Sequence, residues 1–355
     1  MTSRKELIEK IKKTGGKSIQ TLKDSTLFNI EFTPTTIPAM NLAMSARFDG
    51  GIMQGHTMIA GPSKHFKSMF ALTLAADYLK ARPDAVLLFY INEFGTPKKY
   101  FESLGIDDEQ ALVEPVETVE ELTHKLANQL QNFTKEDEVI VVIDSIGNIA
   151  SKKELEDALK GDDKQDMTRA KKMKAMFRII TPMLTTRSIP LITINHTYKT
   201  LEMFSKDVVS GGTGSYYSAD NIWIVGRRQY KDKKSDTEIS GWEFIINVEK
   251  SRYVREKAKI PITVEFNGGI NKRSGLFDLA MATGWIEKPK QGYYNIIDKT
   301  TGEVLAENLR EADAKKSEVL DVLLTKKEFT KPIEDYYGLG GGSIDIPDSG
   351  VEEDD

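Results

Sequence analysis

Short apolar runs alternate with longer segments of mixed polarity from about residue 37 to residue 285. This alternation is typical of successive strand–helix units and predicts an α/β fold with a mostly parallel central sheet. The runs at 85–91 and 139–143 are apolar almost throughout, as expected of central strands that are covered on both faces. Further strands are expected at 56–60, 189–195, 221–226, 242–248 and 262–266, the later ones as an antiparallel extension of the sheet.

The two ends of the chain depart from this pattern. Residues 1–35 open with apolar residues at helical spacing, and we expect an N-terminal helical arm that contacts another subunit. The core would occupy 36–285, and a more highly charged stretch at 286–337 would form a small C-terminal region. Residues 338–355 begin with GLGGGS, which is typical of a flexible linker, and end in an acidic tail.

The composition narrows the classes of function. The 355 residues include no cysteine and four histidines, which excludes a disulfide framework and argues against a structural zinc site. The N-terminus is polar, and no run of about 18 apolar residues occurs, which is the length that a membrane-spanning helix needs. We therefore expect a cytoplasmic protein with no membrane partner.

The net charge of −5 conceals an uneven distribution. Residues 167–178 hold five basic residues and no acid, whereas 344–355 hold six acids and no base. The sum therefore hides a basic face and an acidic tail, and it does not exclude a polyanion as partner. A further basic stretch, GRRQYKDKK at 226–234, is expected to be an exposed loop.

Residues 61–68, GPSKHFKS, nearly match a phosphate-binding loop. Such a loop follows a strand, turns backbone N–H groups inward, and supplies a lysine for the phosphates and a hydroxyl for Mg²⁺ at the start of a helix. Lys67 and Ser68 supply the lysine and the hydroxyl, and the spacing of apolar residues over 68–80 predicts the helix. The residues that we assign to nucleotide binding here are Gly61, Pro62, Ser63, Lys64, His65, Phe66, Lys67 and Ser68.

Phe66 stands where the loop pattern has its second glycine. Phenylalanine is costly there only if the position demands a positive φ or a close approach by its Cβ. We therefore predict a helical φ for Phe66, with the ring turned away from the phosphates into the adjoining helix or a subunit interface. The alternative interpretation of the stretch is an ordinary strand-to-helix turn with an exposed lysine.

Two carboxylates follow apolar strands elsewhere in the core. Asp144 ends the run at 139–143, where it would hold Mg²⁺ through water. Glu93 follows the run at 85–91, at the strand end where open α/β folds bind ligands, and would orient and deprotonate a water. Either residue alone is equally consistent with an ordinary strand end or helix cap, so the hypothesis depends on their pairing with Lys67.

The order of these segments resembles the RecA-type strand-exchange recombinase family and, within it, the recombinases of T-even-type bacteriophages. The resemblance extends from about residue 35 to about residue 290 and includes LFYINEFGTPKKYFESLGID, VVIDSIGNIASKKELEDAL, DMTRAKKMKAMFRIITP, VEKSR and FNGGI. In the phage branch the phosphate loop likewise carries phenylalanine in place of the second glycine. The resemblance implies a RecA-like P-loop ATPase core with ATP and Mg²⁺ as cofactors.

The resemblance also implies roles for single residues around the nucleotide. Glu93 matches the glutamate that activates water, and Tyr100 matches a tyrosine that stacks on adenine. His196 matches a polar residue that senses the γ-phosphate and connects it to a DNA-binding loop. Lys250 and Arg252 match basic residues that reach the neighbouring subunit's ATP and stabilise charge on the transferring phosphate. The implied catalytic set is Lys67, Glu93, Lys250 and Arg252, with Ser68 and Asp144 at the Mg²⁺.

Two loops of this family hold single-stranded DNA, and they correspond to about 157–168 and 197–217 of this chain. The second is expected to lack clear structure, and glycines would permit its backbone to rearrange. Basic residues on the helix after the first loop would neutralise phosphates without reading sequence. A solvated helix face is the alternative, although the run holds no acid for internal pairing. The implied DNA-binding residues are Arg169, Lys171, Lys172 and Lys174 near the first loop, and Lys199, Met203, Phe204, Lys206, Gly211 and Gly212 in the second.

The leading hypothesis is an ATP-dependent recombinase that forms helical filaments on single-stranded DNA and exchanges strands with a homologous duplex, with DNA-dependent ATP hydrolysis. Self-association is then expected, as are accessory single-strand-binding and loader proteins in the cytoplasm of a host bacterium. A hexameric helicase on the same fold is one alternative, and a non-hydrolysing single-stranded-DNA-binding paralogue is another. A small-molecule kinase is disfavoured because the sequence shows no obvious lid.

Overall fold

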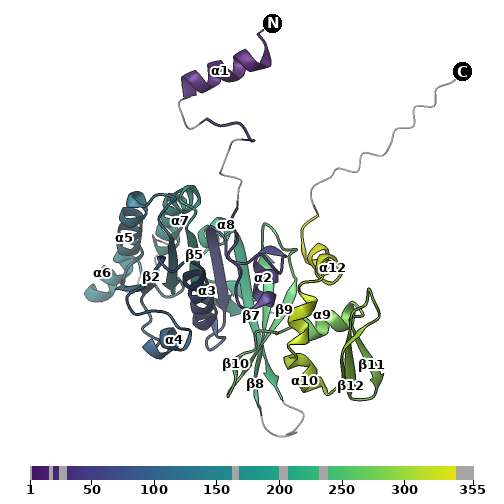
Figure 1. Cartoon of the computed structure of the whole chain (residues 1–355). Helices are drawn as coiled ribbons and strands as arrows, with labels where there is room; N and C mark the ends of the chain where they lie inside the picture. The colour runs from purple at the N-terminus through teal and green to yellow at the C-terminus, as the bar shows by residue number, and fades with distance from the viewer. Residues whose placement is uncertain are drawn as a thin grey trace, which may run out of the picture. The chain divides into compact units, whose positions relative to one another are not determined.

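The computed structural model describes residues 2–15, 19–23, 30–161, 168–199, 207–231 and 239–340 (Figure 1). The chain divides into two units, residues 1–31 and residues 32–355. The first unit contains the predicted N-terminal helix, α1 (Arg4–Gly15). Its apolar side chains Leu7 and Ile11 are about half exposed.

One ten-stranded sheet forms the centre of the second unit, in the order β10-β9-β8-β7-β1-β5-β4-β2-β3, with β6 paired to β5. Neighbouring strands from β3 across to β7 run parallel, whereas β7 to β10 pair in antiparallel fashion, so the predicted mostly parallel sheet with an antiparallel extension is confirmed. The strands are β1 (Gly55–Gly61), β2 (Val86–Ile91), β3 (Ala111–Pro115), β4 (Val139–Asp144), β5 (Pro190–Lys199), β6 (Asp207–Val209), β7 (Asn221–Tyr230), β8 (Gly241–Lys250), β9 (Lys259–Glu265) and β10 (Gly269–Ile270).

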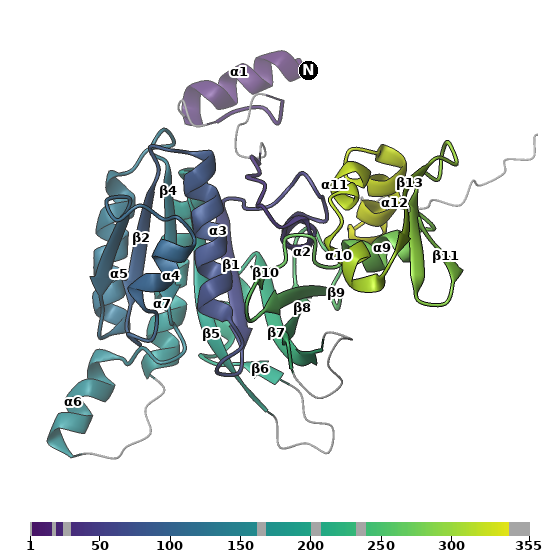
Figure 2. The ribbon, with the colours of Figure 1, turned by 60° about the horizontal axis from the view of Figure 1, so that its bottom comes forward.

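Helices cover both faces of this sheet (Figures 1 and 2). Helices α2 (Pro38–Ser45) and α3 (Lys67–Ala81) pack with Leu87 and Phe89 of β2 in one apolar cluster. Leu88 and Tyr90 of the same strand point the other way, into a cluster with α5 (Val119–Asn132) and α7 (Thr168–Thr186). Burial on both faces explains why the central strands are apolar at every position rather than alternately.

The edge strand β3 was not predicted from the sequence. None of its residues is fully buried, and the adjacent Leu112 and Val113 are each 55% exposed. An edge strand that is not covered on both faces lacks the continuous apolar run by which β2 and β4 were recognised. Within the described ranges, none of the helices combines the length and the apolar character that crossing a membrane requires.

Three segments that were expected to be loops are partly regular structure. The first DNA loop, expected at 157–168, begins inside α6 (Lys152–Lys160), a helix that a capping box of Ser151 and Glu154 starts. The expected structureless stretch at 197–217 contains the end of β5, β6 and helix α8 (Thr213–Ser218). The expected exposed loop at 226–234 belongs to β7 up to Tyr230. The last two expectations were wrong because strand pairing extends both β5 and β7 beyond their apolar runs. The first was wrong because the capped helix α6 continues to Lys160.

The C-terminal region begins with α9 (Leu276–Ala282), before the expected boundary at 286, and its residues 276–337 add a three-stranded antiparallel sheet and four short helices. Trp285, Ile296 and Phe329 of this region are buried in the apolar cluster that also holds α3. Phe329 stacks on Phe48 with ring centroids 6.2 Å apart, so the region and the core share one apolar interior. Its elements are α9 (Leu276–Ala282), β11 (Ile286–Lys290), β12 (Tyr293–Ile297), β13 (Val304–Leu309), α10 (Glu311–Lys316), α11 (Val319–Leu323) and α12 (Lys327–Tyr337). Most of the acidic stretch expected at 338–355 lies outside the described residues.

Replacing Phe329 tests whether the C-terminal region and the core unfold together. Phe329→Ala should lower the free energy of unfolding by about 3–5 kcal/mol, because it leaves a cavity between Phe48 and Trp285. Phe266→Ala, at a side chain that is 61% exposed, is the matched control and should change it by less than about 0.5 kcal/mol. Urea unfolding followed by circular dichroism measures both, and equal effects would contradict a shared interior.

Candidate nucleotide site

The parallel strands end together at one edge of the sheet. Gly61 of β1 is level with His196 of β5, and Ile91 of β2 is level with Asp144 of β4. Residues just beyond these ends therefore meet, as is usual for ligand sites in open α/β sheets. A cavity of about 390 Å³ at this edge brings together most of the predicted nucleotide residues: Ser63, Lys64, His65, Phe66, Lys67, Ser68, Glu93, Tyr100, Asp144 and His196.

The loop at 61–68 connects the end of β1 to the start of α3, as expected of the predicted phosphate-binding loop. Gly61 has φ +156°, and a Cβ there would lie 2.9 Å from the backbone oxygen of Val225, so the close approach of β7 accounts for this glycine. The Lys67 ammonium donates a 2.8 Å hydrogen bond to the Pro62 carbonyl across the loop. Burial lowers the pKa of Lys67, against the opposing influence of Glu93 and Asp144. The lysine is thus enclosed in the cavity, which excludes the exposed lysine of the alternative interpretation.

Phe66 differs from the prediction in its backbone and agrees with it in the direction of its ring. Its φ of 62° and ψ of 15° are left-handed, so the predicted helical φ was wrong. Lys64 has φ 63°, and these two left-handed residues turn the loop into the start of α3. The ring nevertheless packs against Phe70 of α3, with centroids 5.4 Å apart, and stacks on Phe244 of β8 at 5.1 Å. The ring is therefore directed into the adjoining helix, as predicted.

Asp144 and Ser68 form a pair of hard oxygen donors beside Lys67. The Asp144 side chain is buried and accepts hydrogen bonds from Ser68 and, at 2.8 Å, from Thr96 Oγ1. Burial raises the pKa of Asp144, and these two hydrogen bonds oppose the rise. Oxygen donors from a hydroxyl at a helix start and a strand-end carboxylate suit Mg²⁺, so the residues fit the metal that the fold implies. The contact from Thr96 was not predicted from the sequence.

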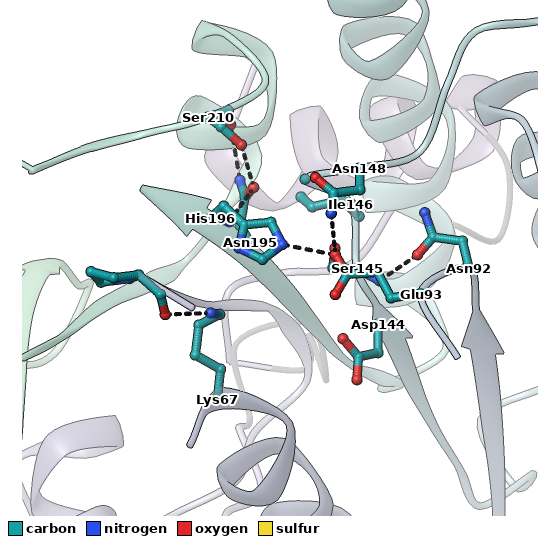
Figure 3. Close-up of polar contacts among 12 residues, drawn as sticks. Lys67, Asn92, Glu93, Asp144, Ser145, Ile146, Asn148, Asn195, His196 and Ser210 are labelled. Atoms are coloured by element: carbon teal, nitrogen blue, oxygen red, sulfur yellow. Dashed lines mark hydrogen bonds and ion pairs between the residues drawn. The ribbon is translucent and has the colours of Figure 1, made fainter. Parts of the chain in front are cut away.

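Glu93 lies at the centre of a hydrogen-bonded cluster (Figure 3). Its Oε1 accepts 2.7 Å hydrogen bonds from His196 Nε2 and from Asn148 Nδ2, and a third from the Ser145 hydroxyl. Burial by itself would raise the pKa of Glu93, but the hydrogen bonds from His196 and Ser145, with the positive charge of Lys67, hold it below its usual value. The side chain is thereby kept as an oriented carboxylate. Asn148 was not predicted, and only its place just beyond the β4 strand end points to this edge of the sheet.

A chain of hydrogen bonds leads from this carboxylate to the second predicted DNA loop (Figure 3). Asn195 lies between His196 and Ser210: its Oδ1 accepts from the His196 backbone N–H at 2.8 Å, and its Nδ2 donates to the Ser210 carbonyl at 2.9 Å. The Ser210 hydroxyl donates back to Asn195 Oδ1 at 2.8 Å. Ser210 is followed by Gly211 and Gly212, both at positive φ. Sequence reasoning missed Asn195, because a single buried amide at a strand end has no distinctive pattern.

Lys250 and Arg252 each contact other residues of their own chain. Neither belongs to the described residues that line the cavity. The Lys250 ammonium donates to three carbonyls at the end of α8, including that of Ala219 at 2.7 Å, and burial lowers its pKa. Arg252 forms a 2.6 Å ion pair with Asp220. Their role at a neighbouring subunit's nucleotide stays a prediction.

The predicted DNA-binding residues near the first loop divide into two kinds. The Arg169 guanidinium donates to the backbone carbonyls of Ile146, Gly147 and Ile149, and so holds the loop that carries Asn148. Three lysines on the same helix, α7, are exposed: Lys171, Lys172 and Lys174. The Lys172 ammonium lies 3.5 Å from the Glu120 carboxylate. These exposed lysines therefore contribute to the basic face of α7, whereas Arg169 binds the backbone of its own chain.

The second predicted DNA region lies against the first. Gly214 of α8 has its Cα so close to α7 that a Cβ would fall 2.6 Å from the Lys174 Cβ. Gly212 also lies against α7, since a Cβ there would be 3.4 Å from the Ala170 Cβ. Lys199 is exposed at the end of β5. Met203, Phe204 and Lys206 lie outside the described residues.

Two family models match the chain, and together they cover most of it. The RecA N-terminal domain matches residues 3–271, and the C-terminal domain of the bacteriophage T4 recombination and repair protein matches residues 273–333. The chain therefore belongs to the RecA family, as the resemblance in its sequence predicted.

Individual relatives agree with this assignment. The recombination and repair protein of Enterobacteria phage T4 is 45% identical over 349 residues, which is 97% of this chain and 88% of that protein. Protein RecA of Bacteroides thetaiotaomicron is 27% identical over 81% of this chain and 85% of its own length. A mitochondrial DNA repair protein recA homolog of Dictyostelium discoideum is 26% identical over 77% of this chain and 59% of its own length. The expected likeness to the recombinases of T-even-type bacteriophages, which are the UvsX type, is thereby confirmed.

Removing the imidazole at 196 should raise the pKa of the Glu93 carboxyl, because the carboxylate loses its 2.7 Å donor while its burial persists. Carbon-13 NMR of glutamate-labelled protein measures this pKa in the wild type and in His196→Ala, with Glu93→Gln identifying the resonance. His124→Ala, at an exposed histidine of α5, is the control and should leave it unchanged.

The same contact should make stability depend on pH. Because the folded-state pKa of Glu93 is depressed, the stabilisation is present above the unfolded-state pKa and is lost as the pH falls through the folded-state pKa. The stability difference between the wild type and His196→Ala should therefore shrink over that acidic range. An identical Glu93 pKa in the two proteins would contradict the role of His196.

Proposed function

We propose that the chain is a DNA-dependent ATPase of recombination and repair, which forms helical filaments on single-stranded DNA and exchanges strands with a homologous duplex. The observation that carries the proposal is the continuous hydrogen-bonded path from Glu93 through His196 and Asn195 to Ser210. A carboxylate at a phosphate site is thereby joined to a glycine-containing segment beside exposed lysines. The names of the similar proteins, which refer to recombination and repair, support the same conclusion.

The cavity residues divide the work of ATP hydrolysis among themselves. Bound Mg²⁺-ATP would supply the phosphoryl group to be transferred and the metal charge that offsets its negative charge. Lys67 and the loop N–H groups would hold the phosphates, with Ser68 and Asp144 toward the metal. Glu93, kept as a carboxylate, would orient a water and accept its proton. Tyr100, which is 37% exposed at the cavity, would offer its ring to the adenine.

The DNA-binding face would be formed by α7 and the segment from β5 to α8. Exposed lysines on α7 suit a phosphate backbone, and they give affinity that depends on salt and not on sequence. Homology would then be tested by base pairing, so the protein needs no contacts that identify bases. A shift of His196 on ATP binding or hydrolysis would reach Ser210 and the glycines after it, and this would couple DNA binding to the nucleotide.

Filament formation would complete the active site. Lys250 and Arg252 do not line the cavity of their own chain, and we propose that they act at the nucleotide of a neighbouring subunit. A cation delivered in this way stabilises charge on the transferring phosphate and can accelerate the reaction by several orders of magnitude. The exposed apolar residues of α1, Leu7 and Ile11, are proposed to contact another subunit.

The proposal predicts that single-stranded DNA stimulates ATP hydrolysis and that filaments form in the same mixture. Steady-state ATPase assays with and without DNA, combined with electron microscopy of the samples, measure both. Closed rings would favour the helicase alternative. Absence of both stimulation and filaments would contradict the recombinase.

Glu93→Gln should reduce the DNA-stimulated turnover number by about 10²–10⁴-fold, because the amide keeps the shape of the side chain and cannot accept a proton. Affinities for ATP and for single-stranded DNA should stay close to those of the wild type. Glu109→Gln, at an exposed glutamate before β3, is the matched control and should hydrolyse ATP normally. Normal turnover in Glu93→Gln would remove Glu93 from the proposed role.

A further inference from the structure

We propose that Arg227 and Phe244, on the paired strands β7 and β8, are positioning residues that hold the phosphate loop in the conformation that binds nucleotide. They are more than 150 residues away from the loop in sequence, and neither is among the described residues that line the cavity. The inference rests on the proposed nucleotide site and adds an external support to it.

The loop needs support because two of its residues adopt an unfavourable backbone conformation. Lys64 and Phe66 have φ of 63° and 62°, a region that is uncommon for residues with a Cβ and persists only where the surroundings enforce it. Phosphate loops ordinarily have glycine at the second of these positions, where a positive φ costs nothing. Contacts from outside the loop must therefore offset the free-energy cost of the positive φ at these residues.

Phe244 supports Phe66, the second of the two left-handed residues. Its ring stacks on that of Phe66, with centroids 5.1 Å apart and an angle of 21° between the planes. Phe70 meets both rings edge-on, at 5.4 Å from Phe66 and 5.7 Å from Phe244. Phe70 and Phe244 are buried, so the Phe66 ring packs between two side chains that have little freedom to move. Rotating residue 66 into a helical φ would take the ring out of this cluster.

Arg227 supports Lys64, the first of the two left-handed residues. Its Nη1 donates a 3.1 Å hydrogen bond to the carbonyl of Lys64. The guanidinium also lies 4.1 Å above the ring of Trp242, a cation–π contact that keeps an otherwise exposed side chain in place. Arg227 is directly opposite Phe244 in the β7–β8 pairing, so the two side chains belong to the same face. One face of these strands therefore contacts both left-handed residues of the loop.

This arrangement predicts an effect on nucleotide binding that does not depend on DNA. The loop binds phosphates through N–H groups whose direction is set by the φ and ψ of residues 64–66. Relaxation of these angles would turn the donors away, whereas Glu93 and His196 would keep their contacts. A different role for Arg227, as a DNA phosphate contact within the basic stretch at 226–234, would leave nucleotide affinity unchanged when DNA is absent.

Isothermal titration of Mg²⁺-ADP into the full chain without DNA tests the proposal. Arg227→Ala should weaken ADP binding by about tenfold, the loss expected for a charge-assisted hydrogen bond. The matched control is Arg228→Ala, because the adjacent side chain pairs with Glu243 and should not affect ADP binding. Equal ADP affinities of Arg227→Ala and Arg228→Ala would overturn the proposal.

A second pair of variants separates backbone support from simple loss of charge. In the Arg227→Ala background, Lys64→Gly should restore part of the ADP affinity, because glycine adopts a positive φ without external support. Lys64→Ala in the same background removes the same charge but keeps a Cβ, and it should not restore affinity. Equal affinities of the two double variants would contradict the positioning role.

The wild type distinguishes failure of this inference from failure of the proposed function. If the wild-type protein does not bind Mg²⁺-ADP, this result contradicts both the proposed nucleotide site and the inference. If the wild type binds and Arg227→Ala binds equally well, only the positioning role of β7 and β8 is lost. Circular dichroism of each variant confirms that the sheet is intact before affinities are compared.

Discussion

Parallel pairing of β1, β5, β4 and β2 is the constraint on which the site depends. It fixes four strand ends at one edge of the sheet, with Gly61 level with His196 and Ile91 level with Asp144. Each strand is buried on both faces, so a shift of register by one residue would exchange the two apolar clusters as well as misalign the site. The same packing that stabilises the fold thereby holds the phosphate loop, Glu93 and His196 within one cavity of about 390 Å³.

The hydrogen bonds at this edge connect the cavity to the segment at Ser210, and we propose that they couple the two. Glu93 is held by three donors from two different strand ends, and one of these donors, His196, continues through Asn195 to Ser210. The contacts from Ser145 and those of Asn195 are partly buried, where hydrogen bonds are stronger and unpaired groups are costly. We propose that a change at the carboxylate is transmitted along these contacts. The route leads to α8, which packs closely on the lysine-bearing helix α7.

Much of this arrangement could be predicted from the sequence, because its signals are local. Continuous apolar runs identified the central strands, and the residues just beyond them, such as Glu93 and Asp144, could be placed at one edge by the rules of parallel sheets. The left-handed φ of Phe66 could not be predicted, because its ring packs on Phe244, which is distant in sequence. Asn195 and Arg227 were missed for the same reason: each acts through a tertiary contact that has no periodicity or motif.

Coupling between the nucleotide pocket and the DNA-binding face is the central claim. The most direct test is the affinity for a labelled single-stranded oligonucleotide, measured by fluorescence anisotropy with and without a non-hydrolysable ATP analogue, in wild type and His196→Ala. The account predicts that the analogue tightens binding in the wild type by at least about fivefold, and that this tightening is lost in the variant while its affinity without nucleotide is unchanged. Equal tightening in both proteins would contradict the account.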